Sequence, residues 1–191
     1  MSTPVHDFTT VVPKWVPYVT PVRLDAASPE QLEAMKVTPS NTKVSDYVLT
    51  LAHDPESLAV RSPLFNAIMY GTDGLSRAER ELGAVGASIV NRCVYCAAVH
   101  SSRYNQLTKR TDVMETIFAG GTAAELDDHS QAIFDFAVAL STTPSQATSD
   151  HVEALRNLGL SDLEMVDLVL SAAIFGWANR LMHTLGEPVA A

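Results

Sequence analysis

Residues 76–100, SRAERELGAVGASIVNRCVYCAAVH, predict two helices joined by a tight corner. Ser76 with Glu79 three positions later is typical of an N-terminal capping box, so the first helix is expected to begin there and to end near Asn91. Neither glycine nor proline occurs from Cys93 to residue 110, which favours a second helix. The corner places Cys93 in or near a first helical turn, where free backbone N–H groups and the helix dipole favour a thiolate.

The first of these helices contains Gly83 and Gly86 in its interior. Each glycine costs about 1 kcal/mol of helix stability relative to alanine. Small residues at these positions are understandable if other helices approach closely there, so we expect this helix to be central in the fold.

The second helix contains the only two cysteines of the 191 residues, Cys93 and Cys96, followed by His100. At about 3.6 residues per turn the three side chains lie on one stripe of the helix. A thiol–disulfide enzyme needs a partly ionised thiol, a second thiol nearby and a group that moves protons, and this stripe supplies all three. Glu81, on the preceding helix, is flanked by apolar residues where a solvated carboxylate is not expected, and it could orient the histidine.

The rest of the chain shows helical spacing of apolar residues and no sustained alternation typical of strands, so the predicted fold class is all-α. Further helices are expected over residues 29–36, 44–52, 55–70, 112–119, 122–142, 150–158 and 161–185. Pro63 predicts a kink or break near Arg61 and Ser62.

Residues 1–28 contain four prolines among large aromatic residues, a pattern that excludes a regular element longer than one turn. We expect an irregular arm that packs against the body or a neighbouring subunit. Residues 29–191 are expected to form a single domain.

A repeated sequence motif indicates a duplicated helical unit. Gly74-Leu75-Ser76-x-x-Glu79 recurs as Gly159-Leu160-Ser161-x-x-Glu164, and both following helices contain an Asn-Arg pair, at residues 91–92 and 179–180.

Composition limits the partners. A formal net charge of −9 argues against binding nucleic acid or an anionic membrane surface. The most apolar long stretch, residues 165–178, contains Asp167 and is too short to span a bilayer, and no secretory signal is visible. We expect a soluble cytoplasmic protein, and 47% hydrophobic residues suggest burial between subunits of a homo-oligomer.

The pattern Glu81-x11-Cys93-x2-Cys96-x3-His100 resembles the signature of AhpD-like alkylhydroperoxidases, within the carboxymuconolactone decarboxylase superfamily, and most closely its peroxidase-related subgroup. The resemblance is specific over residues 75–103. It implies an AhpD-like helical bundle that forms a dimer, trimer or hexamer.

The same resemblance implies roles for these residues. Cys96 would attack a hydroperoxide to give a sulfenic acid, Cys93 would resolve it to a disulfide, and His100 and Glu81 would relay protons, with no cofactor or metal. A thiol reductant protein, of the dihydrolipoyl type in known members, would restore the dithiol. The chain departs from characterised hydroperoxidases at Tyr95, where they have histidine. The decarboxylase branch lacks the cysteine pair.

Three alternatives remain open. The cysteines and His100 could be buried structural residues. Two thiolates, an imidazole and a carboxylate could hold zinc in a non-catalytic helical module, although a structural zinc site usually takes its ligands from two separate segments. A cofactor-free lyase or isomerase could use Glu81 and His100 as acid and base.

Overall fold

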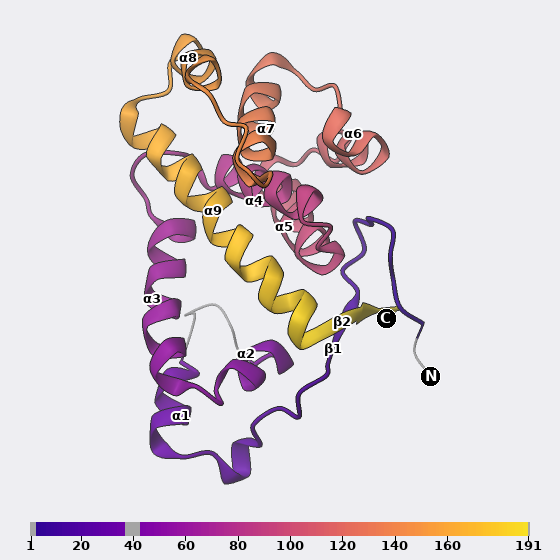
Figure 1. Ribbon diagram of the computed structural model, residues 1–191, viewed down its shortest axis with the longest axis vertical. Helices are drawn as coiled ribbons and strands as arrows, with labels where there is room; N and C mark the ends of the chain where they lie inside the picture. Colours follow the sequence, from indigo (N-terminus) through magenta and orange to yellow (C-terminus); the bar gives the residue numbers. More distant parts are fainter. Residues whose placement is uncertain (1–2, 37–42, 191) are drawn as a thin grey trace.

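Helices form nearly all of the regular structure in residues 3–36 and 43–190, which are the residues that the computed structural model describes. The all-α prediction is therefore confirmed (Figure 1). The elements in chain order are β1 Lys14–Pro17, η1 Leu24–Ala26, α1 Pro29–Ala34, α2 Asp46–Leu51, α3 Pro55–Tyr70, α4 Arg77–Val90, α5 Val94–Thr108, α6 Asp112–Gly120, η2 Gly121–Ala123, α7 Asp128–Ser141, α8 Ser149–Asn157, α9 Asp162–Leu185 and β2 Gly186–Val189.

Helix α4 is central, as the sequence predicts, and packs against α5, α7 and α9. Its capping box is formed, because the Ser76 amide donates to Glu79 Oε2 at 2.9 Å and the Glu79 amide donates to Ser76 Oγ at 3.3 Å. A Cβ added at Gly83 would lie 2.9 Å from Leu168 Cδ1 of α9, and one at Gly86 would lie 2.8 Å from Ala137 Cβ of α7. The two glycines therefore permit close approach of both neighbouring helices.

A buried ion pair joins α4 to α9. Arg80, which is 1% exposed, donates to Asp167 Oδ2 at 2.7 Å, and the Leu75 amide donates to the same oxygen at 3.0 Å. Gly74 precedes this contact at φ 75° and leaves space that a Cβ would take from the carboxylate. Asp167 is thus a packing residue of the core, and its position fixes the start of α4.

Helix α9 crosses the whole bundle (Figure 1). Its length and composition would allow it to span a membrane, the one described helix of which this is true, but half of its most apolar window is buried inside the protein. Core helices of soluble proteins have the same composition. The buried part of this helix packs against α3, α4 and α7.

The N-terminal arm contains a strand, so the prediction of no regular element in residues 1–28 is wrong at Lys14–Pro17. β1 pairs antiparallel with β2, with Trp15 opposite Pro188. The sequence did not reveal this strand because its partner lies at the far end of the chain. The arm packs against the body as predicted, since Trp15 is buried and its Nε1 donates to the Met182 carbonyl at 3.2 Å. Residues 1 and 2 of the arm, and 37–42 and 191 of the predicted domain, lie outside the described residues.

One predicted helix boundary is wrong, and of the kink or break predicted near Pro63 the break does not occur. α7 begins at Asp128, not near Thr122, because the Asp127 side chain accepts from the Ser130 amide at 3.1 Å and so caps a later start. α3 continues through Pro63 without a break.

The two copies of the repeated sequence motif have the same structure only at their N-terminal helix caps. Ser161 and Glu164 form the same capping box as Ser76 and Glu79. Asn91, however, ends α4, whereas Asn179 lies inside α9. The duplication of a helical unit stays a prediction.

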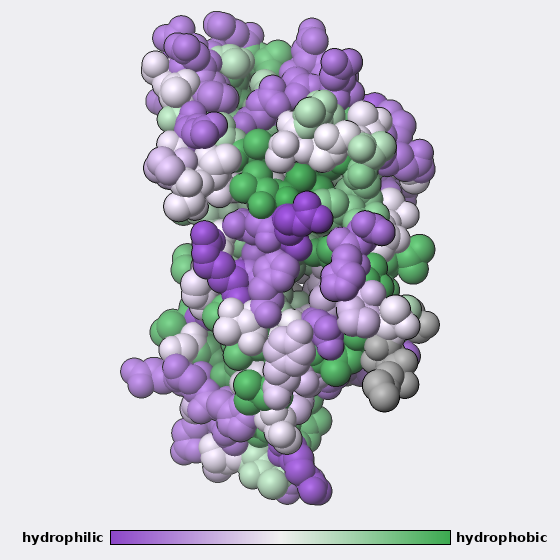
Figure 2. Space-filling view, turned by 45° about the vertical axis from the view of Figure 1, so that its right-hand side comes forward, coloured by the Kyte–Doolittle hydropathy of each residue, from purple (hydrophilic) through white to green (hydrophobic). Residues whose placement is uncertain are grey.

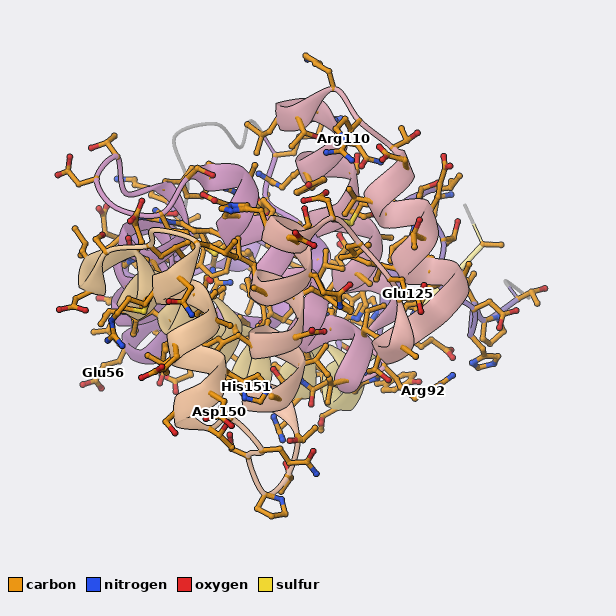
Figure 3. The ribbon with its side chains drawn as sticks, turned by 90° about the horizontal axis from the view of Figure 1, so that it is seen from above. Glu56, Arg92, Arg110, Glu125, Asp150 and His151 are labelled. Carbon is orange, nitrogen blue, oxygen red and sulfur yellow. The ribbon has the colours of Figure 1, made fainter. Side chains whose placement is uncertain are left out.

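The surface is mixed in polarity. Figure 2 shows hydrophilic side chains around the end of the molecule where α6 to α8 lie, and exposed hydrophobic patches nearer the middle. Viewed from above in Figure 3, Arg92 and Arg110 lie on different sides, with Glu56 and Glu125 at other points of the periphery. These labelled arginines do not gather on one face.

Candidate functional site

The corner between α4 and α5 brings the two cysteines together. Arg92 adopts a left-handed conformation, φ 54°, and the Cys93 amide donates to the Ser88 carbonyl at 2.9 Å. Cys93 is the N-cap residue of α5, and Cys96 lies in its first turn. Their Sγ atoms are 2.8 Å apart and both cysteines are free thiols, so either sulfur can reach the other without backbone movement.

The two thiols differ in acidity. Burial raises the pKa of Cys96 well above its ordinary value, and the hydrogen bond and charge of Cys93 raise it further. The hydrogen bond from Cys96 lowers the pKa of Cys93, against the opposing effect of burial. Cys93 therefore ionises first, and Cys96 holds the proton that the pair shares.

The side chains of Glu81 in α4 and His100 in α5 are in contact. Glu81 is completely buried, and its Oε2 forms a hydrogen bond with His100 Nδ1. Its other oxygen, Oε1, accepts from Arg77 Nε at 2.7 Å. Burial raises the pKa of Glu81, but His100 and Arg77 together lower it by more than burial raises it, so the pKa lies below its ordinary value. A carboxylate in this position fixes the imidazole with Nδ1 as the donor, which leaves Nε2 as the basic nitrogen.

A small cavity of about 170 Å³ gives access to this group. Cys96 and His100 line it, whereas Cys93 and Glu81 lie behind them. Phe175 closes one side, with its ring centroid 4.2 Å from that of His100. The four residues singled out from the sequence are thus brought together at one site, with one thiol and one imidazole facing the cavity.

Several residues of the site had been missed in the sequence. Arg77, one turn before Glu81, could have been found from the i, i+4 spacing of opposite charges. Tyr47 of α2 and Arg61 of α3 also line the cavity, and no local pattern links these distant segments to the cysteines. Tyr95 lines it as well, and burial raises its pKa.

Three aromatic residues of α5 and α9 differ in where they lie. Phe175 is in the core and lines the cavity. Tyr104 does not face the cavity but belongs to the core cluster between α4, α6 and α7. Trp177 is 45% exposed on α9.

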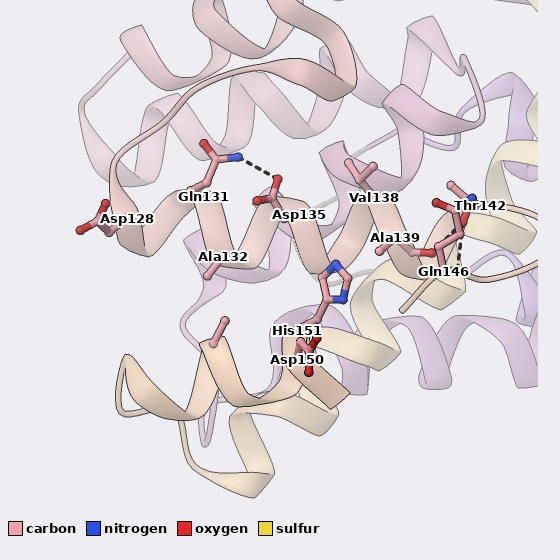
Figure 4. A pocket seen from close by; sticks show the side chains of 11 residues that line it. Asp128, Gln131, Ala132, Asp135, Val138, Ala139, Thr142, Gln146, Asp150 and His151 are labelled. Carbon is pink, nitrogen blue, oxygen red and sulfur yellow. Dashed lines mark hydrogen bonds between the residues drawn. The ribbon is translucent and has the colours of Figure 1, made fainter. Parts of the chain in front are cut away.

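A larger cleft of about 570 Å³ lies between α7 and α8 (Figure 4). His151 points into it, but its Nδ1 accepts from the Thr148 amide at 3.2 Å and so caps α8. Gln131 donates to Asp135 at 2.7 Å on the opposite wall. This cleft contains no cysteine, and its polar groups serve local structure.

No group of three or more His, Cys, Asp or Glu side chains in residues 3–36 and 43–190 is arranged to hold a metal ion. The nitrogen of His100 that faces Glu81 is already hydrogen-bonded.

The model of the carboxymuconolactone decarboxylase family matches residues 55–127, which include all four site residues. No curated protein sequence matches the chain.

Solved structures match nearly the whole chain. A peroxidase-related protein with an AhpD core from Ralstonia eutropha JMP134 is 27% identical, with 92% of each chain covered and a TM-score of 0.76. Two further structures, at 24% and 20% identity, share the fold. The first is a peroxidase-related protein from Silicibacter sp. TM1040, with 95% of this chain and 96% of that chain covered and a TM-score of 0.77. The second is the debrominase Bmp8, with 91% of this chain and 92% of that chain covered and a TM-score of 0.75. The match of the carboxymuconolactone decarboxylase family model to residues 55–127 and the fold shared with these structures support the AhpD-like and carboxymuconolactone decarboxylase superfamily as the family of this chain.

Proposed function

We propose that this protein is a thiol-dependent peroxidase that reduces a hydroperoxide with Cys96 and Cys93, assisted by His100 and Glu81. The observation that supports this most directly is the pair of free sulfurs 2.8 Å apart, one of which lines a small cavity together with an imidazole. A pair that served only packing would need neither access to a cavity nor a buried carboxylate behind the histidine.

The reaction starts from a pair that has lost one proton. Cys93 ionises first, and transfer of the Cys96 proton across the 2.8 Å contact makes Cys96 the thiolate. This thiolate attacks the outer oxygen of the hydroperoxide, the O–O bond breaks, and the alkoxide leaves as an alcohol after taking up a proton. Cys96 is then a sulfenic acid, and the peroxide has accepted two electrons.

The second step closes the disulfide. The Cys93 sulfur attacks the Cys96 sulfur, the S–O bond breaks, and the hydroxide leaves as water with the proton of the Cys93 thiol. Two thiols and one hydroperoxide thus yield one disulfide, one alcohol and one water. The first turn of α5 holds the sulfurs close enough for this step.

His100 handles the protons. Glu81 holds Nδ1, so Nε2 can take the proton that the cysteine pair loses first, give it to the leaving alkoxide, and then carry the proton of the Cys93 thiol to the leaving hydroxide. Arg77 keeps Glu81 charged. Because Tyr95 replaces the histidine of characterised hydroperoxidases, the whole relay falls to His100.

The cycle requires a reductant in the cell. A protein dithiol, such as a dihydrolipoyl protein, can exchange with the disulfide and return both thiols. Such an exchange suits a protein of the reducing cytoplasm, where we place it.

We also propose a homo-oligomer, because α3 and α9 expose large apolar side chains, including Val60, Leu64 and Trp177. Sedimentation velocity on the reduced protein tests this, and a monomer at micromolar concentration would contradict it.

The central experiment counts free thiols. Fully reduced protein is mixed with one equivalent of tert-butyl hydroperoxide, and the expected result is the loss of two thiols per chain within minutes, with release of tert-butanol. Two thiols that stay reduced would refute the peroxidase assignment.

Two controls separate this proposal from its rivals. A lyase or isomerase that relies on Glu81 and His100 would keep its activity after alkylation of both thiols, whereas the peroxidase would lose it. A zinc module would contain stoichiometric metal after purification without chelator and would lose helicity on chelation.

A further inference from the structure

The cavity beside Cys96 is lined by three arginines from three helices. Arg61 comes from α3, Arg77 from α4 and Arg103 from α5. Only Arg77 is paired with a carboxylate, that of Glu81. Arg103 donates to the neutral hydroxyl of Tyr70 at 3.0 Å. The cavity therefore holds more positive than negative charge, in a chain whose net charge is −9.

Arg61 is the least satisfied of the three. Its Nε is buried and has no hydrogen-bond partner among residues 3–36 and 43–190. Its guanidinium lies over the Phe65 ring, 4.5 Å from the centroid, and no described carboxylate forms an ion pair with it. The residues outside the described part of the chain include no Asp or Glu that could supply one. Burial lowers the pKa of Arg61, as expected for an uncompensated cation.

Tyr47 supplies a second unused donor on the same wall. Its hydroxyl is buried without a partner in the described part of the chain. Burial raises its pKa to about 12, so the hydroxyl keeps its proton at neutral pH. Its ring lies 5.9 Å from the guanidinium carbon of Arg61, and both cysteines act electrostatically on it. Buried donors without partners are rare in folded proteins and indicate that an acceptor is missing.

We propose that this cavity binds a hydroperoxide that bears a carboxylate, which pairs with Arg61 and accepts from Tyr47 while its peroxide group faces Cys96. This inference names the substrate class and rests on the proposed peroxidase function. An ionised carboxylate satisfies both donors at once and compensates the buried charge, which a neutral peroxide cannot do. A cavity of about 170 Å³ limits the substrate to a compact acid and excludes long-chain fatty acid hydroperoxides held entirely inside.

The test uses two thiol reagents of nearly equal size, iodoacetate and iodoacetamide. The fully reduced protein is alkylated with each, and the rate of modification at Cys96 is read from fragment masses that separate Cys96 from Cys93 within their shared peptide. The ratio of the iodoacetate rate to the iodoacetamide rate is compared between the wild type and Arg61→Gln. We expect this ratio to fall by about tenfold in the variant, since a hydrogen bond to a charged group is lost.

Three variants make the comparison specific. Arg61→Lys should retain part of the preference for the anion. Arg61→Met, which fills the space without polar atoms, should lose this preference for the anion. A loss in both variants shows that the effect does not depend on the new glutamine. Arg156→Gln removes a positive charge from exposed α8 and should leave the ratio unchanged.

The outcomes are distinguishable. An unchanged ratio in Arg61→Gln overturns the inference. If the ratio is unchanged because both reagents slow equally, Arg61 acts on the thiolate and not on the anion. A parallel experiment measures oxidation by tert-butyl hydroperoxide, which is neutral, and the control Arg156→Gln should react within about twofold of the wild type. If this peroxide oxidises neither protein, the peroxidase function fails, while the ratio of the two alkylating reagents still reports on anion binding.

Discussion

Glu81 and His100 form a hydrogen-bonded pair between α4 and α5, with the carboxylate completely buried and the imidazole at the wall of the cavity. The pair is held from the other side by Arg77. Three charged or ionisable groups therefore share a site that hydrophobic packing alone would fill with apolar residues.

Replacing Glu81 with glutamine is expected to lower the free energy of unfolding by roughly 3 kcal/mol at pH 7, because the half-buried Arg77 loses its counter-charge. The pKa of Glu81 is lower in the folded protein than in the unfolded chain. Its contribution is therefore present above the unfolded value of about 4.3 and is lost as the pH falls through the lower folded value. Urea unfolding between pH 3 and pH 7 measures this.

The matched control for this variant is Glu153→Gln, which removes an exposed carboxylate from α8. It should leave stability within about 0.5 kcal/mol of the wild type. Wild-type and Glu81→Gln proteins whose difference in stability does not shrink in acid would contradict the assigned ion pair.

Cys93→Ser is expected to stop the reaction at the sulfenic acid of Cys96. Cys96, which lines the cavity, makes the first attack, more slowly because its proton no longer passes to Cys93, and the missing second sulfur prevents the disulfide. One equivalent of hydroperoxide should be consumed, and dimedone should add to Cys96 as shown by peptide mass. Cys96→Ser should consume none. A dimedone adduct on Cys93 in the latter variant would reverse the roles of the two cysteines.

The acidity of the pair gives an independent measurement. The hydrogen bond from Cys96 lowers the pKa of Cys93. Alkylation of Cys93 by iodoacetamide should therefore follow a titration with a midpoint below about 8.5, the ordinary value of a cysteine. In Cys96→Ala, which removes the hydrogen-bond donor to the thiolate, the midpoint should rise. Identical midpoints in both proteins would mean that the contact between the sulfurs does not stabilise the thiolate.

Gly86 and Gly176 form a matched pair for the packing of the bundle. Gly86→Ala should destabilise the protein by about 1–3 kcal/mol, because the new Cβ would lie 2.8 Å from Ala137 Cβ on α7. Gly176→Ala in α9 meets only the end of the Arg180 side chain, 3.6 Å away, and should stabilise by about 0.5–1 kcal/mol through helix propensity. Thermal unfolding of both variants checks the pair, and equal effects of the same sign would refute the close approach of α4 and α7.

The parts of the fold that local signals specify could be predicted from the sequence. The capping boxes at Ser76 and Ser161 mark the starts of α4 and α9, and the corner at Arg92 follows from the short spacing between two helices. The start of α7 could not be predicted, because Thr122 and Asp127 are both acceptable caps and only the packing of the preceding turn selects the later one.

The candidate site divides in the same way. Cys93, Cys96 and His100 lie on one helix, so their proximity follows from helical spacing, and Glu81 follows from its apolar neighbours. Arg61 and Tyr47 reach the cavity from helices far away in the sequence, and nothing local in α2 or α3 points to the cysteines. A strand in the arm was equally hidden, since the pairing of β1 depends on residues 186–189.

Trp15 of that strand packs against the two cysteines. It packs in one cluster with Cys93, Cys96 and Met182, and its Nε1 donates to the Met182 carbonyl at 3.2 Å. Trp15→Ala should therefore cost about 3–5 kcal/mol of stability and speed alkylation of Cys93, which is 2% exposed beneath the arm. Val11→Ala, at an exposed position of the same arm, should change neither. If Trp15→Ala loses stability while Cys93 stays as unreactive as in the wild type, the arm supports the fold without shielding the thiols.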